Sequence, residues 1–226
     1  MPAKAGIQAM LAAFEQLRTR TNAMHRLRRT SLFFLAVTTL LFMTAQPARA
    51  HPHVWVDYAI EARFDATGLV GFQHRWTFDE MFSSQIMDMF DADGNGVFSD
   101  EEIEEVRRGA FEYLSEYDYF IQIKVNDSPF HVASVTDFRA SIQGHQVVYD
   151  FFIPCPVPVG AEPKIVHLLV ADMEYFVDLG LETDGLSVSG KEHVSVRSAF
   201  HSSEAFSFWG GAWEPRHLTL EFQKSS

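Results

Sequence analysis

Apolar and polar residues alternate over residues 53 to 64, and this period of two is typical of a β-strand. The stretch from Asp65 to Gly68 supplies turn-forming residues, so residues 69 to 78 predict a second strand that pairs back on the first. Strand-like stretches return after Asp118. They cover residues 119–127, 128–138, 146–159, 164–172, 174–181 and 217–223. Many short strands with this spacing predict a mainly β fold, either an antiparallel sandwich or a barrel-like sheet.

Between the second strand and Asp118 the apolar period changes to three and four residues. This spacing predicts a short amphipathic helix over residues 79 to 90 and a second helix over residues 101 to 117. We therefore expect a helical hairpin to be inserted into the β fold at about residues 79 to 115. We assign the aromatic and methionine side chains of this region to core packing, the aromatic ones between the hairpin and the sheet: Trp76, Phe78, Phe82, Phe90, Met81, Met87 and Met89.

The stretch 146–159 carries three prolines and the only cysteine of the chain. Pro154, Pro156 and Pro158 have no amide hydrogen, so they place this segment at a sheet edge or at the end of a strand. Cys155 is a single cysteine, which excludes an intramolecular disulfide. It has no neighbouring histidine to act as a base, and no other nucleophile motif is present, so we do not expect an enzyme and name no catalytic residue.

The N-terminal region has the features of a secretory signal peptide. From Met24 a basic start precedes an apolar run over residues 31 to 43, and the segment closes with Ala48-Arg49-Ala50. The run is shorter than the roughly 20 residues that span a bilayer, so we prefer cleavage to anchoring. Residues 1 to 23 are then an extra segment or a misassigned start. We predict a single periplasmic domain over residues 51–226, with no stable membrane insertion after cleavage.

The chain is acidic, with a formal net charge of −12. Such a charge repels the phosphate backbone of nucleic acids and attracts cations. Composition therefore excludes nucleic acid as a partner and favours metal ions.

The loop between the two predicted helices, DADGNGVFSDEE, has the spacing of an EF-hand calcium loop. Calcium takes six to eight oxygen ligands, which a loop of about 12 residues supplies from positions 1, 3, 5, 7, 9 and 12. The predicted ligands are Asp91, Asp93, Asn95, the backbone carbonyl of Val97, Ser99 through a water, and Glu102. Gly96 occupies the turn position. The alternative is a solvated turn that is merely rich in Asp, Asn and Gly. Because no second such loop is present, we expect weak binding and a structural role.

A second candidate metal site lies at the predicted mature N-terminus. His51, His53 and Asp57 share one face of the first strand, where alternate residues are about 7 Å apart. Imidazole binds zinc, nickel, cobalt and copper. Cleavage after Ala50 would also give His51 a free amino group beside its own imidazole, the arrangement of a histidine brace. The alternative is a solvated, frayed chain end.

His74 is the candidate for a third imidazole, because the turn after Asp65 returns the second strand toward the chain start. A slip of one residue in the pairing would turn His74 to the other face, and a structural histidine is an equally good interpretation. The remaining histidines have no ligand spacing, so we assign them structural or exposed roles: His131, His145, His167, His193, His201 and His217. His193 and His201 could still join a site through folding.

Four stretches in this order resemble a bacterial exported family called domain of unknown function 1007: HPHVWVD at 51–57, HRWTFDEMFS at 74–83, the loop at 91–102 and EYDYF at 116–120. The resemblance extends from His51 to about Leu181. Members are labelled as a periplasmic component of an uncharacterised ABC-type transport system and are associated with nickel/cobalt efflux-type permeases. The resemblance therefore implies a role in transition-metal handling with a membrane metal permease as partner.

Three hypotheses follow from the sequence. The first is a periplasmic metal-binding accessory protein of a nickel, cobalt or zinc transport system, with a structural calcium site. The second is a calcium-stabilised interaction module without a transition-metal role. The third, which has the least support, is a copper redox enzyme that uses a histidine brace.

Overall fold

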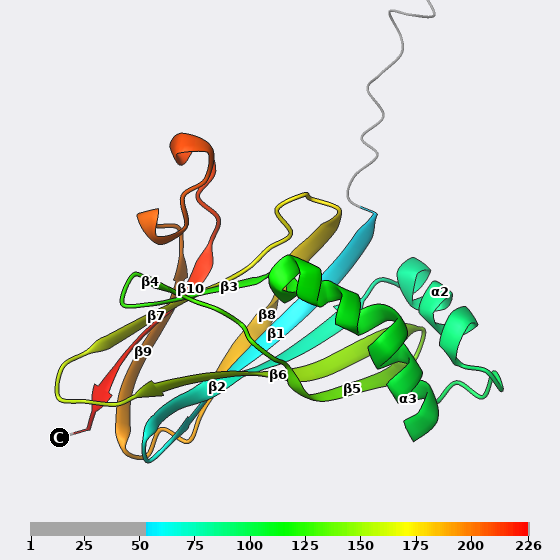
Figure 1. Ribbon diagram of the computed structural model, residues 1–226, viewed down its shortest axis with the longest axis horizontal. Helices are drawn as coiled ribbons and strands as arrows, with labels where there is room; N and C mark the ends of the chain where they lie inside the picture. The colour runs from blue at the N-terminus through cyan, green and yellow to red at the C-terminus, as the bar shows by residue number, and fades with distance from the viewer. Residues whose placement is uncertain (1–52, 226) are drawn as a thin grey trace, which may run out of the picture. The chain divides into compact units, whose positions relative to one another are not determined.

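Two long strands open the part of the chain that the structure describes, and the first buries one of its faces. In the computed structural model, which describes residues 53–225, β1 (Val54–Asp65) and β2 (Gly68–Phe78) pair antiparallel (Figure 1). Even-numbered residues of β1 are buried, whereas their odd-numbered neighbours are exposed or half-buried. The carboxylate of Asp65 accepts hydrogen bonds from the amide and the hydroxyl of Thr67 and so fixes the turn. The predicted hairpin is therefore confirmed.

β1 and β2 lie inside a first sheet of five strands, in the order β5-β6-β2-β1-β8. The other members are β5 (Thr136–Gln143), β6 (Gln146–Pro158) and β8 (Val177–Ser189). Neighbouring strands are antiparallel except β1 and β8, which run parallel. The expectation of an antiparallel sheet is thus corrected at this edge. β8 is distant from β1 in the sequence, so no short turn forces the two strands into opposite directions.

A second sheet is antiparallel throughout, in the order β4-β3-β7-β10-β9. Its strands are β3 (Ile121–Val125), β4 (Ser128–Phe130), β7 (Lys164–Val170), β9 (Val194–His201) and β10 (His217–Lys224). The predicted last strand is confirmed as β10, although it lies between β7 and β9 and not at an edge. Residues of both sheets share one hydrophobic core, where Phe64 meets Phe222 edge to face with ring centroids 5.0 Å apart. The fold is mainly β, as predicted.

The proline-rich part of β6 extends beyond its neighbour β5. β5 pairs with β6 only between Gln146 and Phe152, whereas β2 pairs with β6 as far as Pro158. The prolines therefore lie where β6 has a strand partner on one side only. This agrees with the predicted edge or strand-end position, because a proline nitrogen has no hydrogen to donate to a second neighbour.

Two helices occupy the predicted positions after β2, α2 (Glu80–Phe90) and α3 (Asp100–Val106). The second predicted helix does not continue regularly to residue 117. A π-helical turn, η1 (Arg107–Phe111), and a 3₁₀ segment, η2 (Glu112–Phe120), follow α3 instead. The helical geometry ends at Tyr117, after which Asp118 and Tyr119 adopt left-handed φ angles of 50° and 54°.

α2 packs closely on η1 because Gly109 has no side chain. A Cβ atom at Gly109 would lie 2.9 Å from the Phe90 ring, so a larger residue there would have to displace that ring. Met81 and Met89 are 59% and 63% exposed, which corrects their assignment to the core. A helix that touches the sheet with one side cannot bury apolar residues on every side. Ile86 of the same helix is fully buried.

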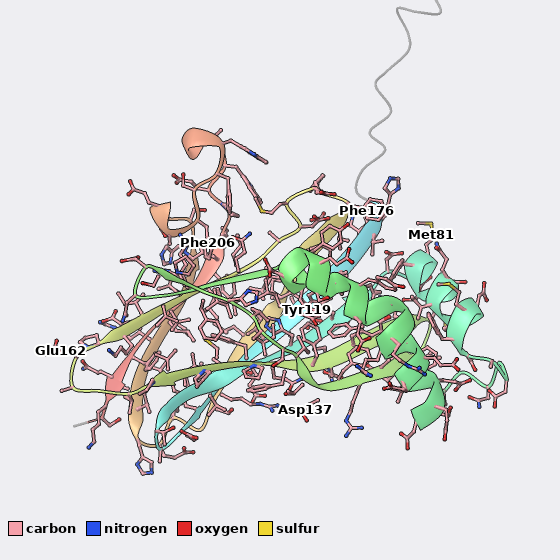
Figure 2. All side chains as sticks on the ribbon, viewed as in Figure 1. Met81, Tyr119, Asp137, Glu162, Phe176 and Phe206 are labelled. Carbon is pink, nitrogen blue, oxygen red and sulfur yellow. The ribbon has the colours of Figure 1, made fainter. Side chains whose placement is uncertain are left out.

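The helical run, which consists of α3, η1 and η2 over residues 100–120, covers the buried face of the first sheet. Phe111 stacks on Phe138 of β5 with ring centroids 4.3 Å apart and also contacts Phe151 of β6. Tyr119, labelled in Figure 2, packs on Phe111 at 5.4 Å. The aromatic side chains therefore hold the helices on the sheet, as the sequence predicted.

Two predictions fall on residues outside the described part of the chain. The signal peptide at residues 24–50 and the extra segment at residues 1–23 both lie there. Within residues 53–225, the helices are all too short or too polar to cross a bilayer.

Candidate functional site

The loop between α2 and α3 is fixed at both ends by hydrogen bonds. The amide of Asp91, at the end of α2, donates to the carbonyl of Met87. At the other end, the hydroxyl of Ser99 accepts from the amide of Glu102, while the carboxylate of Glu102 accepts from the amide of Ser99. This reciprocal cap turns the Glu102 side chain back toward the loop.

Three carboxylates converge in this loop. Asp91, Asp93 and Glu102 each bring one oxygen to within 4.8 Å of the others. The amides of Ser99 and Ala92 donate hydrogen bonds to Glu102 and hold the pKa of that carboxyl below its usual range. Three negative charges at this distance repel one another, and a cation placed between them would be attracted by all three.

Asn95 and Gly96 wrap the loop backbone around the same carboxylates. The amide of Gly96 donates to Asp91 Oδ2 at 2.9 Å, and the amide of Asn95 donates to one oxygen each of Asp91 and Asp93 at 3.2 and 3.1 Å. Gly96 has a φ of 78°, in the left-handed region that favours glycine. A carboxylate offers about four lone-pair positions, so an oxygen that accepts an amide hydrogen can also bind a cation.

The remaining predicted ligands, Val97 and Ser99, lie on either side of Phe98, whose side chain anchors the loop. Phe98 is 6% exposed and belongs to the hydrophobic core, whereas the side chain of Val97 is exposed. The predicted metal-ligand atoms of the loop are all oxygens, the ligand type that Ca²⁺ prefers. The residues present therefore fit a calcium ion.

The structure does not bring the described members of the N-terminal set together. His53, which directly precedes β1, and Asp57 of β1 are both exposed, as the alternation predicted. Four positions on extended backbone span roughly 13 Å, so the two side chains are too far apart to bind one ion together. His51 falls outside the described residues. The ring of His53 packs on Phe176 with centroids 4.7 Å apart, and its amide donates to the carbonyl of Phe176 at 2.9 Å. These contacts tie the start of β1 to the segment that precedes β8.

His74 lies on the opposite face from His53 and Asp57. It pairs with Ile60 across the hairpin, is fully buried, and stacks on Phe151. Burial lowers its pKa to about 3. The expectation that His74 joins the N-terminal histidines is therefore corrected. The sequence of β2 already indicates that His74 is buried, because His74 shares its face with the bulky apolar residues Phe72, Trp76 and Phe78.

The fold gathers three histidines that the sequence left scattered. His217 lies on β10, between His167 on β7 and His201 on β9. Its ring centroid is 5.3 Å from that of His167 and 5.4 Å from that of His201. His167 is hydrogen-bonded to Thr219, and His217 to Ser203 and the carbonyl of Pro215. Within residues 53–225, the acidic triplet of the loop is the one group of three or more metal-ligand side chains whose ligand atoms lie within 4.8 Å. The three rings are thus neighbours without converging on one point.

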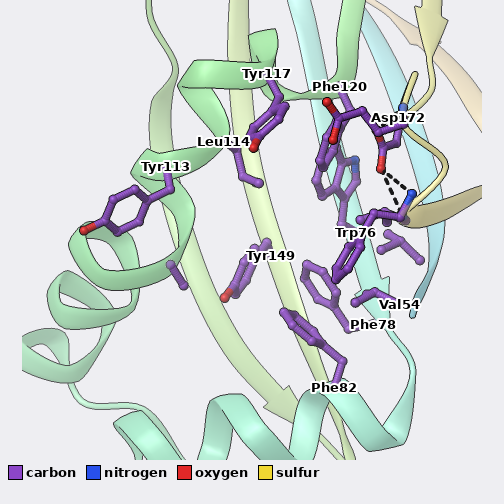
Figure 3. A pocket seen from close by; sticks show the side chains of 15 residues that line it. Val54, Trp76, Phe78, Phe82, Tyr113, Leu114, Tyr117, Phe120, Tyr149 and Asp172 are labelled. Carbon is purple, nitrogen blue, oxygen red and sulfur yellow. Dashed lines mark hydrogen bonds between the residues drawn. The ribbon is translucent and has the colours of Figure 1, made fainter. Parts of the chain in front are cut away.

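A cavity of about 370 Å³ lies between the helical run and the buried face of the first sheet (Figure 3). Tyr113, Leu114 and Tyr117 line it from η2, and Trp76 and Tyr149 line it from the sheet. The sequence pattern predicted packing alone for Trp76, Phe78 and Phe82, which also line this cavity. The cavity could not be inferred from that pattern, because the wall residues come from strands and turns far apart in the chain.

The family of the chain follows from its match to a family model. A model described as Protein of unknown function (DUF1007) matches residues 36–199, which is more than half of the chain. The chain belongs to the DUF1007 family. The family match includes β1, β2, the loop at 91–102 and η2, and it ends within β9. The resemblance noted in the sequence is confirmed at the level of the family, which has no assigned activity.

A relative in *Spirochaeta aurantia* is described as an uncharacterized 15.5 kDa protein in the trpE 3′ region. It is 28% identical to this chain over 140 residues, which cover 60% of this chain and 96% of the relative. Its description assigns no activity.

Proposed function

We propose that the protein is an extracytoplasmic binding module stabilised by one calcium ion in the loop at residues 91–102. The observation that carries this proposal is the convergence of Asp91, Asp93 and Glu102 within 4.8 Å. Asn95, the carbonyl of Val97 and Ser99 complete the proposed ligand set. A single loop of this kind is expected to bind calcium at about 10⁻⁴ to 10⁻³ M, the range of extracellular modules.

Calcium would act on the structure around the cavity. α2 contributes Phe82 to the cavity wall, and the segment after α3 contributes Ala110 and Tyr113. The loop joins these two parts of the wall. An ion that fixes the loop would therefore fix the spacing between the wall segments, which supports a structural role for calcium.

The test is calcium titration of the exported chain, purified with its natural N-terminus, by calorimetry and thermal unfolding. Calcium is expected to raise the unfolding temperature, and Glu102→Gln to abolish most of the effect because it removes the closing carboxylate. Glu101→Gln is the matched control, since Glu101 is an exposed neighbour of the same charge. An unfolding temperature that is unchanged at about 10 mM calcium, ten times the weakest expected dissociation constant, would contradict the proposal. The proposal would also be contradicted if Glu102→Gln and Glu101→Gln reduced the calcium-induced rise in unfolding temperature equally.

A second candidate is a metal-binding accessory protein for a nickel, cobalt or zinc transport system. It is favoured by the exposed position of His53 directly before β1. His51 would supply the second imidazole, and a membrane metal permease would be the partner. The site proposed now omits His74, which faces the core.

Equilibrium dialysis distinguishes this second candidate from a module that binds calcium alone. The exported chain is expected to retain nickel, cobalt, zinc or copper, and the double change His51→Ala with His53→Ala to lose it. The double change His131→Ala with His145→Ala removes two exposed histidines elsewhere and is the control. No retention, or retention that survives loss of His51 and His53, would eliminate the transition-metal role.

A further inference from the structure

The cavity beneath the helical run has the size of a small-molecule site and is open to solvent on one side. Its volume of about 370 Å³ falls within the range of about 300 to 1,000 Å³ found for ligand pockets. Figure 3 shows Tyr113 and Tyr117 on the helical side and Trp76 and Tyr149 on the sheet side. The question is which chemical class of ligand these walls would bind.

Aromatic rings form most of the wall. The rings of Trp76 and Phe120 are nearly parallel, with an interplanar angle of 17° and centroids 6.4 Å apart. Tyr117 lies 5.8 Å from Phe120, and Phe78 meets Tyr149 edge to face at 4.8 Å. The faces of such rings carry partial negative charge and attract cations, most strongly where water is excluded.

The charged groups of the wall have one sign. Asp172 and Glu174 line the cavity, and no Lys, Arg or His is among its lining residues. Asp172 is 7% exposed, and its carboxylate accepts hydrogen bonds from the amides of Phe176 and Val177, drawn as dashed lines in Figure 3. Its other oxygen accepts from the amide of Glu174. These bonds hold the carboxylate in place at the wall. An anionic ligand is therefore disfavoured, whereas a cation is favoured by both the acidic groups and the rings.

Tyr149 Oη, a polar atom of the wall, has no hydrogen-bond partner within residues 53–225. Trp76 Nε1 has none there either, but it is a donor and needs an acceptor, which an ammonium group does not supply. A buried polar group without a partner costs stability unless a ligand supplies one. The phenolic oxygen of Tyr149 can accept a hydrogen bond from a ligand N–H. An ammonium group has such hydrogens, and a quaternary or neutral apolar ligand does not.

We propose that this cavity binds a small organic ammonium ion that carries an aromatic or aliphatic arm. The arm packs on the rings of the wall, and the ammonium group lies against the ring faces, where it donates a hydrogen bond to Tyr149 Oη. The carboxylates of Asp172 and Glu174 favour its positive charge from the same wall. This site is separate from the calcium loop, so its occupancy is measured both with EDTA and with calcium. Failure of the calcium proposal thus leaves this test valid.

Calorimetric titration with three matched probes tests the ligand class. Phenethylammonium, 2-phenylethanol and phenylacetate share one aromatic arm and differ in charge. The ammonium ion is expected to bind at least tenfold more tightly than the alcohol, and phenylacetate to bind no more tightly than the alcohol. Equal affinities for the three probes would overturn the proposal, as would the absence of binding by phenethylammonium.

Four substitutions of exposed residues test the location of the site without endangering the fold. Tyr117→Leu removes a ring of the wall and Glu174→Gln removes a charge, and each is expected to weaken binding of phenethylammonium at least threefold. Trp209→Leu also removes an exposed aromatic ring, and Glu162→Gln also removes an exposed charge, but both lie outside the cavity and are expected to leave the affinity unchanged. If the two pairs behave alike, the ammonium ion does not bind in this cavity.

Discussion

The imidazole of His74 lies flat against the ring of Phe151, with centroids 5.2 Å apart and planes 9° from parallel. The two residues are cross-strand neighbours in β2 and β6, and both face the core. Neither ring nitrogen of His74 has a hydrogen-bond partner among residues 53–225. Because no group in the core stabilises the imidazolium, burial lowers the pKa of His74 to about 3.

Replacing His74 by leucine is expected to raise the free energy of unfolding and to weaken its dependence on pH. In the wild-type protein the unfolded chain binds a proton at His74 below about pH 6.5, whereas the folded protein binds it only near pH 3. Stability is therefore lost as the pH falls through this window, by roughly 2 kcal/mol at pH 5 at ~1.36 kcal/mol per pH unit.

Urea unfolding at pH 7 and pH 5 measures this effect. His145→Gln changes an exposed histidine and is expected to behave as the wild type at both pH values. The interpretation fails if His74→Leu loses as much stability between pH 7 and pH 5 as the wild type does.

Asp79 joins the helical insertion to the sheet. Its Oδ1 accepts from the amide of Phe82 and caps α2, while its Oδ2 accepts from the amide of Trp55 in β1, both at 2.9 Å. Asp79→Ala removes both acceptors and is expected to lower the free energy of unfolding by about 2 kcal/mol. Asp88→Ala, at an exposed position of the same helix, is the control and is expected to cost less than about 0.5 kcal/mol. Equal losses in urea unfolding would show that Asp79 is not a structural link.

Gly96 is required by the turn of the loop and not by lack of space. No atom lies within 4 Å of the position of an added Cβ, but its φ of 78° is unfavourable for other residues. Gly96→Ala is therefore expected to destabilise the protein by about 1 kcal/mol in the absence of calcium. Gly160→Ala is the matched control, because that position has ordinary φ and its nearest atoms are 3.9 Å away. A Gly96→Ala variant as stable as the control in urea would contradict this account.

Cys155 is expected to be unreactive in the folded protein. Its side chain is fully buried in β6, and burial raises the pKa of the thiol to about 12, so almost no thiolate is present at neutral pH. Labelling with a chromogenic disulfide at pH 7.5 should proceed only after unfolding in urea. Rapid labelling of the native protein would show that β6 opens readily at this position.

Features formed by residues that are close together in the chain were predictable from the sequence. The β1–β2 hairpin follows from alternation and from the turn chemistry of Asp65. The approach of Asp91, Asp93 and Glu102 follows from ligand spacing within one short loop. In both cases the interacting groups are close in sequence, so local geometry determines their relation.

The sequence by itself thus determined the strand alternation, the two helices and the oxygen-rich loop between them. Only the tertiary structure decided that β8 pairs parallel with β1, that His74 faces the core beside Phe151, and that distant aromatic residues enclose a cavity. Local patterns fix the direction of a side chain relative to its own strand or helix. Which distant segments meet depends on how the two sheets and the helices pack together, and a single sequence does not display that arrangement.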